Sequence, residues 1–133
     1  MAMASVLGIG GFFFRSRDPK ALARWYADHF DVLEVPDDYD TACWRQSGGA
    51  TVFAPFEQDT AYFGDSDKQW MIAFRVRDLV ALAARLEAAG IPAQIDEQSY
   101  PNGRFARLTD PEGNPIQLWE PAGAARETEE SPG

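Results

Sequence analysis

An internal repeat constrains the fold of this chain more than any other feature. Residues 14–23 and 74–83 match at a constant offset of 60, and seven of the ten positions are identical. In both copies an apolar run leads to an aspartate, Asp18 or Asp78, and then to a segment with helical spacing of apolar residues. Two copies are too few for a stacked solenoid, which generally needs about three or more. The repeat therefore predicts two pseudo-symmetric units that share one curved, mixed sheet system.

The first unit is expected to contain a strand, a helix and three further strands. The apolar run Ile9–Ser16 suits a strand, and Asp18 can cap a helix that continues from Pro19 to Phe30. Proline is favoured in a first helical turn because its missing N–H has no helical partner there. The three further strands are expected at Val32–Val35, Thr41–Gln46 and Thr51–Phe56.

The second unit repeats this order. A strand is predicted over Trp70–Val76, and a helix over Asp78–Ala89 is expected to end at Gly90. The turn Pro101-Asn102-Gly103 contains the Asn-Gly pair that is typical of hairpins. Three strands are expected after the helix, at Ala93–Gln98, Arg104–Thr109 and Pro115–Glu120. The predicted fold class is thus α+β, with two βαβββ modules at about 6–56 and 70–121 and with the helices outside the sheets.

The remaining segments complete the expected domain organisation. Residues Glu57–Gln69 form a polar connection between the modules, and residues 122–133 lack apolar periodicity and are expected to be a disordered tail. A chain of 133 residues with 45% apolar residues suits one domain with a substantial core. We expect a single domain over residues 1–121.

Charge and cysteine content exclude several kinds of partner. The formal net charge of −9 disfavours nucleic acids and anionic membranes, because both are bound mainly by clustered Lys and Arg. No apolar run approaches the ~20 residues of a membrane span. The single cysteine, Cys43, rules out an internal disulfide and suits a cytoplasmic protein.

Three segments carry a resemblance to a known family. The run Gly10–Pro19, the pair Trp25-Tyr26 and above all the turn and strand Asp110–Pro121 resemble the vicinal oxygen chelate superfamily. That superfamily includes glyoxalase I, bleomycin-resistance proteins and extradiol dioxygenases. The resemblance covers about residues 6–121. It implies paired βαβββ modules whose sheets curve around a cleft for a small molecule, and usually a homodimer.

Strand alternation predicts which side chains line such a cleft, since alternate residues of a strand face opposite sides of the sheet. If Phe74 and Leu118 pack under helices, then Arg75, Gln117 and Trp119 face the cleft. The 60-residue offset places Phe13 and Arg15 equivalently in the first module. The candidate ligand-binding residues are Phe13, Arg15, Trp44, Phe53, Met71, Arg75, Phe105, Arg107, Gln117 and Trp119. The alternative for the aromatic members is that they belong to the core.

The resemblance also implies a divalent metal held by His, Glu or Gln side chains. Its ligand positions fall on Gly11, Met71 and Gln117 of this sequence, which are expected to share the cleft. Glycine offers no ligand, methionine suits a hard cation poorly, and glutamine supplies only a neutral oxygen. We therefore expect no cofactor and no family-type metal site. The alternative is nickel, zinc, manganese or iron at an atypical site near Gln117, with Glu57 or Glu120 as a ligand.

Two classes of function remain open. The first is a small-molecule-binding protein of the glyoxalase/bleomycin-resistance type, whose aromatic side chains stack on a ligand while arginines pair with an anionic group. The second is a lyase, isomerase or dioxygenase of the superfamily, either metal-free or with the atypical site. We expect a binding protein and leave open whether it is an enzyme.

No other catalytic group stands out in the sequence. A Cys43–His29 pair is interpreted as a buried unreactive thiol and a helix-end histidine, and Asp65-Ser66-Asp67 as a solvated turn. Tyr62 and Tyr100 could donate hydrogen bonds, although nothing around them in the sequence assigns them that role.

Overall fold

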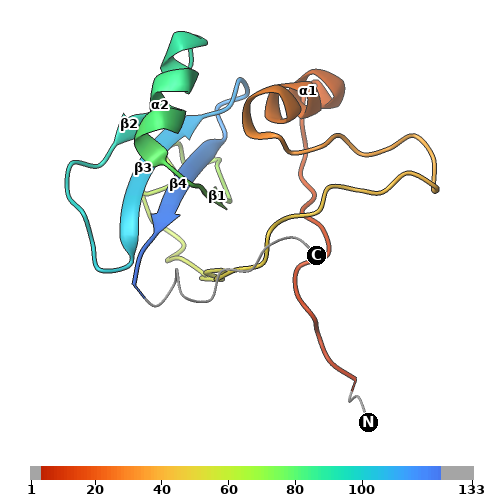
Figure 1. Cartoon of the computed structure of the whole chain (residues 1–133), viewed down its shortest axis with the longest axis horizontal. Helices are drawn as coiled ribbons and strands as arrows, with labels where there is room; N and C mark the ends of the chain where they lie inside the picture. Colours follow the sequence, from red (N-terminus) through yellow and green to blue (C-terminus); the bar gives the residue numbers. More distant parts are fainter. Residues whose placement is uncertain (1–3, 124–133) are drawn as a thin grey trace.

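The computed structural model describes residues 4–123 and shows an α+β architecture (Figure 1). The described elements are α1 (Pro19–Phe30), β1 (Ile72–Arg75), α2 (Leu79–Ala88), β2 (Gln94–Ile95), β3 (Gly103–Thr109) and β4 (Pro115–Pro121). The four strands form one mixed sheet in the order β1-β4-β3-β2. Strand β1 runs parallel to β4, and the other neighbours are antiparallel. Neither helix in this part of the chain is long and apolar enough to cross a membrane.

The second module has the predicted order of elements, but β1 and β2 are shorter than the predicted strands Trp70–Val76 and Ala93–Gln98. The Asp78 carboxylate caps α2 by accepting a hydrogen bond from the N–H of Ala81 at 3.2 Å. After α2, Gly90 adopts a φ of 82°, the left-handed conformation that favours glycine at a helix end. Strands β3 and β4 pair from Gly103↔Pro121 to Thr109↔Pro115. The βαβββ order of this half is therefore confirmed.

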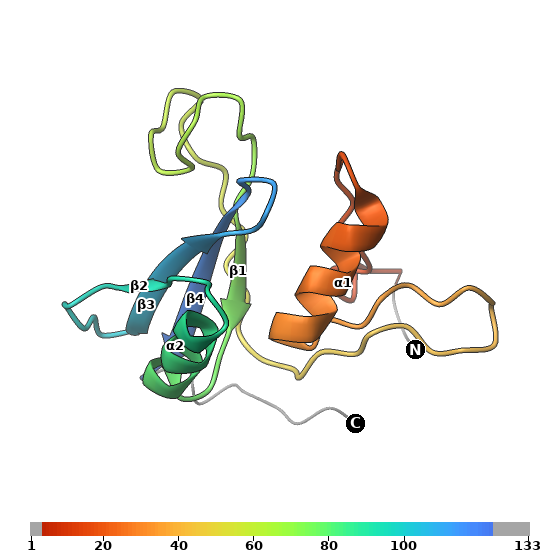
Figure 2. The same ribbon diagram turned by 90° about the horizontal axis from the view of Figure 1, so that it is seen from above.

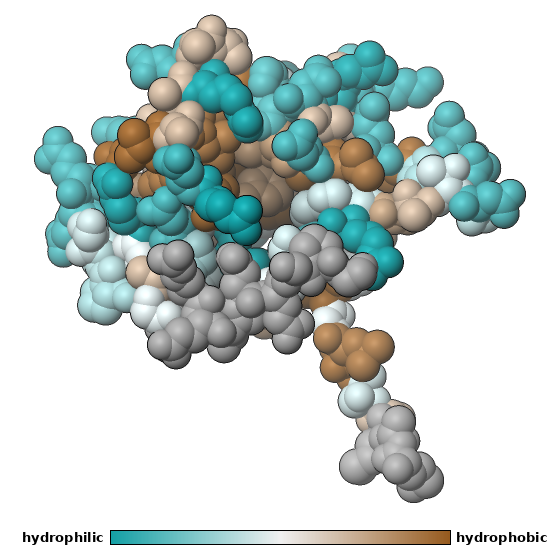
Figure 3. All heavy atoms as spheres, in the orientation of Figure 1, coloured by the Kyte–Doolittle hydropathy of each residue, from teal (hydrophilic) through white to brown (hydrophobic). Residues whose placement is uncertain are grey.

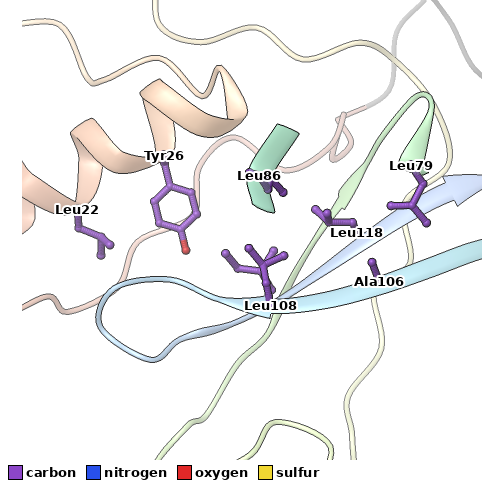
Figure 4. Close-up of a cluster of buried hydrophobic side chains, with 8 residues drawn as sticks. Leu22, Tyr26, Leu79, Leu86, Ala106, Leu108 and Leu118 are labelled. Carbon is purple, nitrogen blue, oxygen red and sulfur yellow. The ribbon is translucent and has the colours of Figure 1, made fainter. Parts of the chain in front are cut away.

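Helix α2 covers one face of the sheet, and α1 packs against the same core from beyond the β1 edge. Ile116 and Leu118 of β4 are fully buried, and Leu79 and Leu86 of α2 pack against them. Figure 4 shows Leu22 and Tyr26 of α1 meeting the same cluster. Figure 2 shows α1 beyond the β1 edge, where Phe30 stacks on Phe74 with ring centroids 5.4 Å apart.

The turn between β3 and β4 fastens α1 to this sheet. The buried Tyr26 hydroxyl donates to the Asp110 carboxylate at 2.7 Å. The carboxylate of Glu112 accepts from the Ser16 hydroxyl at 2.7 Å and from the N–H of Asp18 at 3.1 Å. It also accepts from the N–H of Arg17, and these bonds hold the pKa of Glu112 below its usual value. A carboxylate at the start of a helix is favourable because the N-terminal N–H groups have no helical acceptors.

The strands predicted for the first module do not form, and two pseudo-symmetric modules are not confirmed. Residues 4–18 and 31–70 contain no strand, although strands were predicted at Ile9–Ser16, Val32–Val35, Thr41–Gln46 and Thr51–Phe56. The apolar stripe of α1 packs against the core of the second module instead. Isolated two-stranded hairpins are marginal in water without such a partner.

Large apolar side chains are exposed as a result. Phe13 is 92% exposed and Phe53 is 84% exposed. Figure 3 shows hydrophobic residues at the surface along the N-terminal arm and between the two halves of the molecule. At the other end of the chain, the N–H of Ala122 donates to the Asn102 carbonyl at 3.0 Å, and the rest of the predicted tail, residues 124–133, lies outside the described residues.

Candidate functional site

The sheet face opposite the core gathers five of the ten candidate residues. Because Ile116 and Leu118 point to the helices, Gln117 and Trp119 of β4 point to the opposite side. The cross-strand partners of these two residues on β3 are Arg107 and Phe105. We call these four residues, Phe105, Arg107, Gln117 and Trp119, the strand face. The strand neighbour of Trp119 on the other side is Arg75 of β1.

One end of the strand face is aromatic. The rings of Phe105 and Trp119 are nearly parallel, at 4°, with centroids 6.3 Å apart. The Trp119 indole N–H donates to the Asn102 carbonyl at 2.8 Å, and the residue is only 6% exposed. Tyr100 meets Phe105 edge-on at 5.7 Å. A hydrogen bond to Asp96 raises the pKa of the Tyr100 hydroxyl.

The other end is polar and is in contact with Tyr62. The guanidinium of Arg107 lies over the Tyr62 ring, 4.2 Å from its centroid. Gln117 donates from Nε2 to the Tyr62 hydroxyl at 3.0 Å, and Arg107 also donates to the Tyr62 carbonyl. Tyr62 stacks in turn on Phe56, with centroids 5.7 Å apart. The connection between the predicted modules therefore lies across the strand face.

Arg75 belongs to the same side of the sheet, but its guanidinium is bound to backbone. It donates to the carbonyl of Ser47 at 2.7 Å and to the carbonyl of Gly48 at 3.3 Å. A Cβ on Gly49 would force the guanidinium at the end of the Arg75 side chain to shift. Arg75 thus holds the segment around residue 48 against the sheet.

The first-module candidates are not on the strand face. Phe13 and Arg15 instead line an open hollow of about 640 Å³, together with Trp70. Phe12 and Phe14 pack on the Trp70 ring at 5.0 Å and 4.8 Å. Trp44 and Phe53 are exposed in segments without strands, and Met71 lies one residue before β1. Of the ten predicted residues, four form the strand face, Arg75 lies beside it, and two line the hollow. Trp44, Phe53 and Met71 belong to neither place.

The residues present do not fit a divalent metal of the kind that the resemblance implies. Gly11 has no side-chain donor, and the three atoms nearest to the position of a Cβ there belong to Phe13. The Gln117 amide is engaged with Tyr62, and the Met71 thioether is a soft ligand. Between residues 4 and 123, no three His, Cys, Asp or Glu side chains are grouped as metal ligands.

The two other groups singled out in the sequence lie away from the strand face. His29 is in the last turn of α1, with its ring 5.4 Å from that of Trp25. Cys43 is exposed, so the prediction of a buried thiol is wrong, because the strand expected to bury it does not form.

Sequence reasoning did not assign Tyr62 to the site. It lies in the connection, and its partners on β3 and β4 are 45 and 55 residues away in the chain. The available signal was the concentration of aromatic residues at Phe56, Tyr62 and Phe63 in an otherwise polar segment. Such a cluster indicates packing against something, but not against which strands.

The structure is an α+β domain. Its mixed sheet has the helices and the core on one side and the candidate face on the other. A sequence model of the family described as glyoxalase-like domain matches residues 11–119, most of the chain, and the protein belongs to this family. The family assignment agrees with the resemblance to the vicinal oxygen chelate superfamily. A search of curated proteins gave no match.

Three solved structures are similar over part of the chain. TnmS3, an antibiotic binding protein from Streptomyces sp. CB03234, is 35% identical over 38% of this chain and 41% of its own, with a TM-score of 0.35. A protein of the glyoxalase family from Bacillus anthracis is 28% identical over 41% and 43%, with a TM-score of 0.36. A glyoxalase/bleomycin resistance protein from Streptomyces sp. CB03234 is 35% identical over 37% and 42%, with a TM-score of 0.33. Each match spans about two fifths of the neighbour's length.

Proposed function

We propose that this protein binds a planar aromatic small molecule that carries an anionic or hydrogen-bond-accepting group, and that the ligand lies on the strand face. The observation that carries the proposal is the parallel Phe105–Trp119 pair beside the Arg107 and Gln117 side chains. An aromatic surface next to a few directed polar groups is typical of small-molecule sites.

Each end of the strand face supplies a different part of the recognition. Stacking on Phe105 would favour a flat ring system, since offset aromatic pairs add to the effect of burial. Arg107 can stack on a ring or pair with a carboxylate. Gln117 can donate to an oxygen of the ligand, as it donates to the Tyr62 hydroxyl. Binding needs no further chemistry from these groups, which supports a binding protein over an enzyme.

Calorimetric titration with matched probes tests this proposal. The protein should bind 2-naphthoate more tightly than 2-naphthylmethylammonium, which has a similar shape and the opposite charge. Arg107→Gln should weaken 2-naphthoate binding roughly tenfold, because it removes the charged partner of the carboxylate. Arg24→Gln is the matched control, since Arg24 is an exposed arginine on α1 that forms only a 4.0 Å ion pair with Glu34. Equal affinity for both probes, or equal effects of the two variants, would contradict the proposal.

We also propose that the protein is a homodimer. The first-module segments leave Phe13, Val35 and Phe53 exposed, and β2 is the edge strand of the sheet on the side away from α1. Unpaired edges and exposed apolar segments favour association with another chain. A second copy of this chain offers the complementary edge, as expected for closed two-fold symmetry. The single cysteine supports the further proposal of a cytoplasmic location.

A further inference from the structure

Tyr62 occupies the polar end of the strand face. Its ring lies against the Arg107 guanidinium, and its hydroxyl accepts the Gln117 amide N–H. Arg107 and Gln117 are direct cross-strand partners on β3 and β4, so their side chains project side by side from the same face. Both therefore contact one phenol ring, which a distant part of the chain supplies.

We propose that the Tyr62 side chain occupies the place of the ligand on Arg107 and Gln117 when no ligand is bound. The natural ligand is then an oxygenated aromatic compound that displaces Tyr62 from these two residues. This inference rests on the proposed function and narrows its ligand class. A ring that stacks on the guanidinium and an attached oxygen that accepts from the amide are the two features that Tyr62 displays. A phenolate fits best, because its negative charge also pairs with Arg107.

The contacts that hold Tyr62 are suited to exchange. The side chain is 39% exposed, so it is not part of the core. Its segment, residues 56–63, contains no helix or strand. Besides its contacts with Arg107 and Gln117, Tyr62 stacks on Phe56 of the same segment. The Phe56 ring also packs on Phe63, with centroids 5.1 Å apart. These three rings can leave the sheet together without breaking the β3–β4 pairing, and the bond from Arg107 to the Tyr62 carbonyl is lost in the same step.

Displacement has a measurable consequence. If a ligand can bind only when Tyr62 has left, its apparent affinity is the intrinsic affinity multiplied by the fraction of molecules in which the place is open. If Tyr62 is in place about nine-tenths of the time, its removal raises ligand affinity roughly tenfold. If Tyr62 instead forms part of the binding surface, its removal lowers affinity.

Titration of the full chain with 2-naphthol, followed by NMR, separates these cases. Tyr62→Ala should bind 2-naphthol roughly tenfold more tightly than wild type. Tyr62→Phe should show a smaller gain, since it keeps the ring over Arg107 and loses only the hydrogen bond to Gln117. Tyr39→Ala is the matched control, because Tyr39 is fully exposed outside the site. Wild type should also prefer 2-naphthol to naphthalene, and Gln117→Leu should remove that preference.

The possible results lead to different conclusions. Tighter binding by Tyr62→Ala alone, with the preference for oxygen lost in Gln117→Leu, supports the proposal. Unchanged or weaker binding by Tyr62→Ala, with wild type still binding 2-naphthol and 2-naphthoate, overturns it and leaves the proposed function intact. If neither the wild type nor any variant binds any of the probes, both the proposed function and the displacement of Tyr62 are overturned.

Discussion

Removal of one buried hydroxyl tests how α1 is held to the sheet. Tyr26→Phe deletes the hydrogen bond to the Asp110 carboxylate and leaves the ring in the core. Asp110 keeps its other partners, because Oδ2 still accepts from the Asn114 amide at 2.8 Å and Oδ1 from the N–H groups of Glu112 and Asn114. The carboxylate is therefore not left unsatisfied. The loss should equal one hydrogen bond to a charged group, about 1.5–3 kcal/mol of unfolding free energy.

Urea denaturation followed by circular dichroism measures this loss. Tyr100→Phe is a matched control, since it removes a tyrosine hydroxyl bonded to an exposed aspartate, Asp96, at 2.8 Å. Because both partners are exposed, water replaces that bond, and the control should lose much less stability than Tyr26→Phe. The slope of free energy against urea should stay constant, because neither variant changes the surface exposed on unfolding. Equal losses in the two variants would refute the argument that burial of the Tyr26–Asp110 bond makes it important.

Four further outcomes are expected. Burial is the largest cause that raises the pKa of Tyr26 above its ordinary 10.0, and the hydrogen bond to Asp110 is the next. The contribution of the protonated Tyr26 hydroxyl to the free energy of unfolding is therefore full below about pH 10 and is lost as the pH rises further. Urea titrations from pH 9 to 11 should show this alkaline loss in wild type and a smaller one in Tyr26→Phe. Gly103→Ala should lower the midpoint of thermal unfolding strongly, because Gly103 has a φ of 137° and a Cβ there would collide with the Glu120 carbonyl. Gly10→Ala is the control and should change the midpoint little, because a Cβ on Gly10 would lie in open space. Sedimentation velocity at micromolar concentration should give twice the 14.7 kDa mass of one chain. Phe53→Asp should shift the sedimenting mass towards that of one chain. A wild type that sediments only as a monomer would contradict the proposed dimer. Elemental analysis of the purified protein should find no stoichiometric nickel, zinc, manganese or iron, and one such ion per chain would favour the enzyme alternative.

The sequence predicts the parts of this fold that depend on local chemistry. Asp18 and Asp78 each precede a helix and accept from the N–H three residues on, as the repeat indicates. The Asn-Gly turn forms at the start of β3, where the sequence predicts it. The alternation along β4 places Gln117 and Trp119 opposite the helices. These features follow from capping, turn geometry and the two-residue period of a strand, all of which act within a few residues.

The parts that depend on distant contacts could not be predicted in the same way. The stripe of Leu22 and Tyr26 identifies the buried face of α1, but not the sheet that covers it. The hydrogen bonds of Glu112 to residues 16–18 cross more than 90 positions of sequence. They place α1 on the second module, and the strands expected beneath α1 are then absent. Tyr62 was missed as a site residue for the same reason.

The most direct test of the central claim is to find where 2-naphthoate binds, by NMR of the assigned, ¹⁵N-labelled protein. The strand face and the hollow beside Trp70 contain different reporter groups. Binding on the strand face should shift the backbone amides of Phe105–Arg107 and Gln117–Trp119 and the Gln117 side-chain amide, with a single saturating dependence on ligand concentration. The Trp70 indole and the amides of Phe13–Arg15 should not move with it. Saturating shifts at Trp70 and Arg15, with the strand face unchanged, would contradict the claim and place the ligand in the hollow.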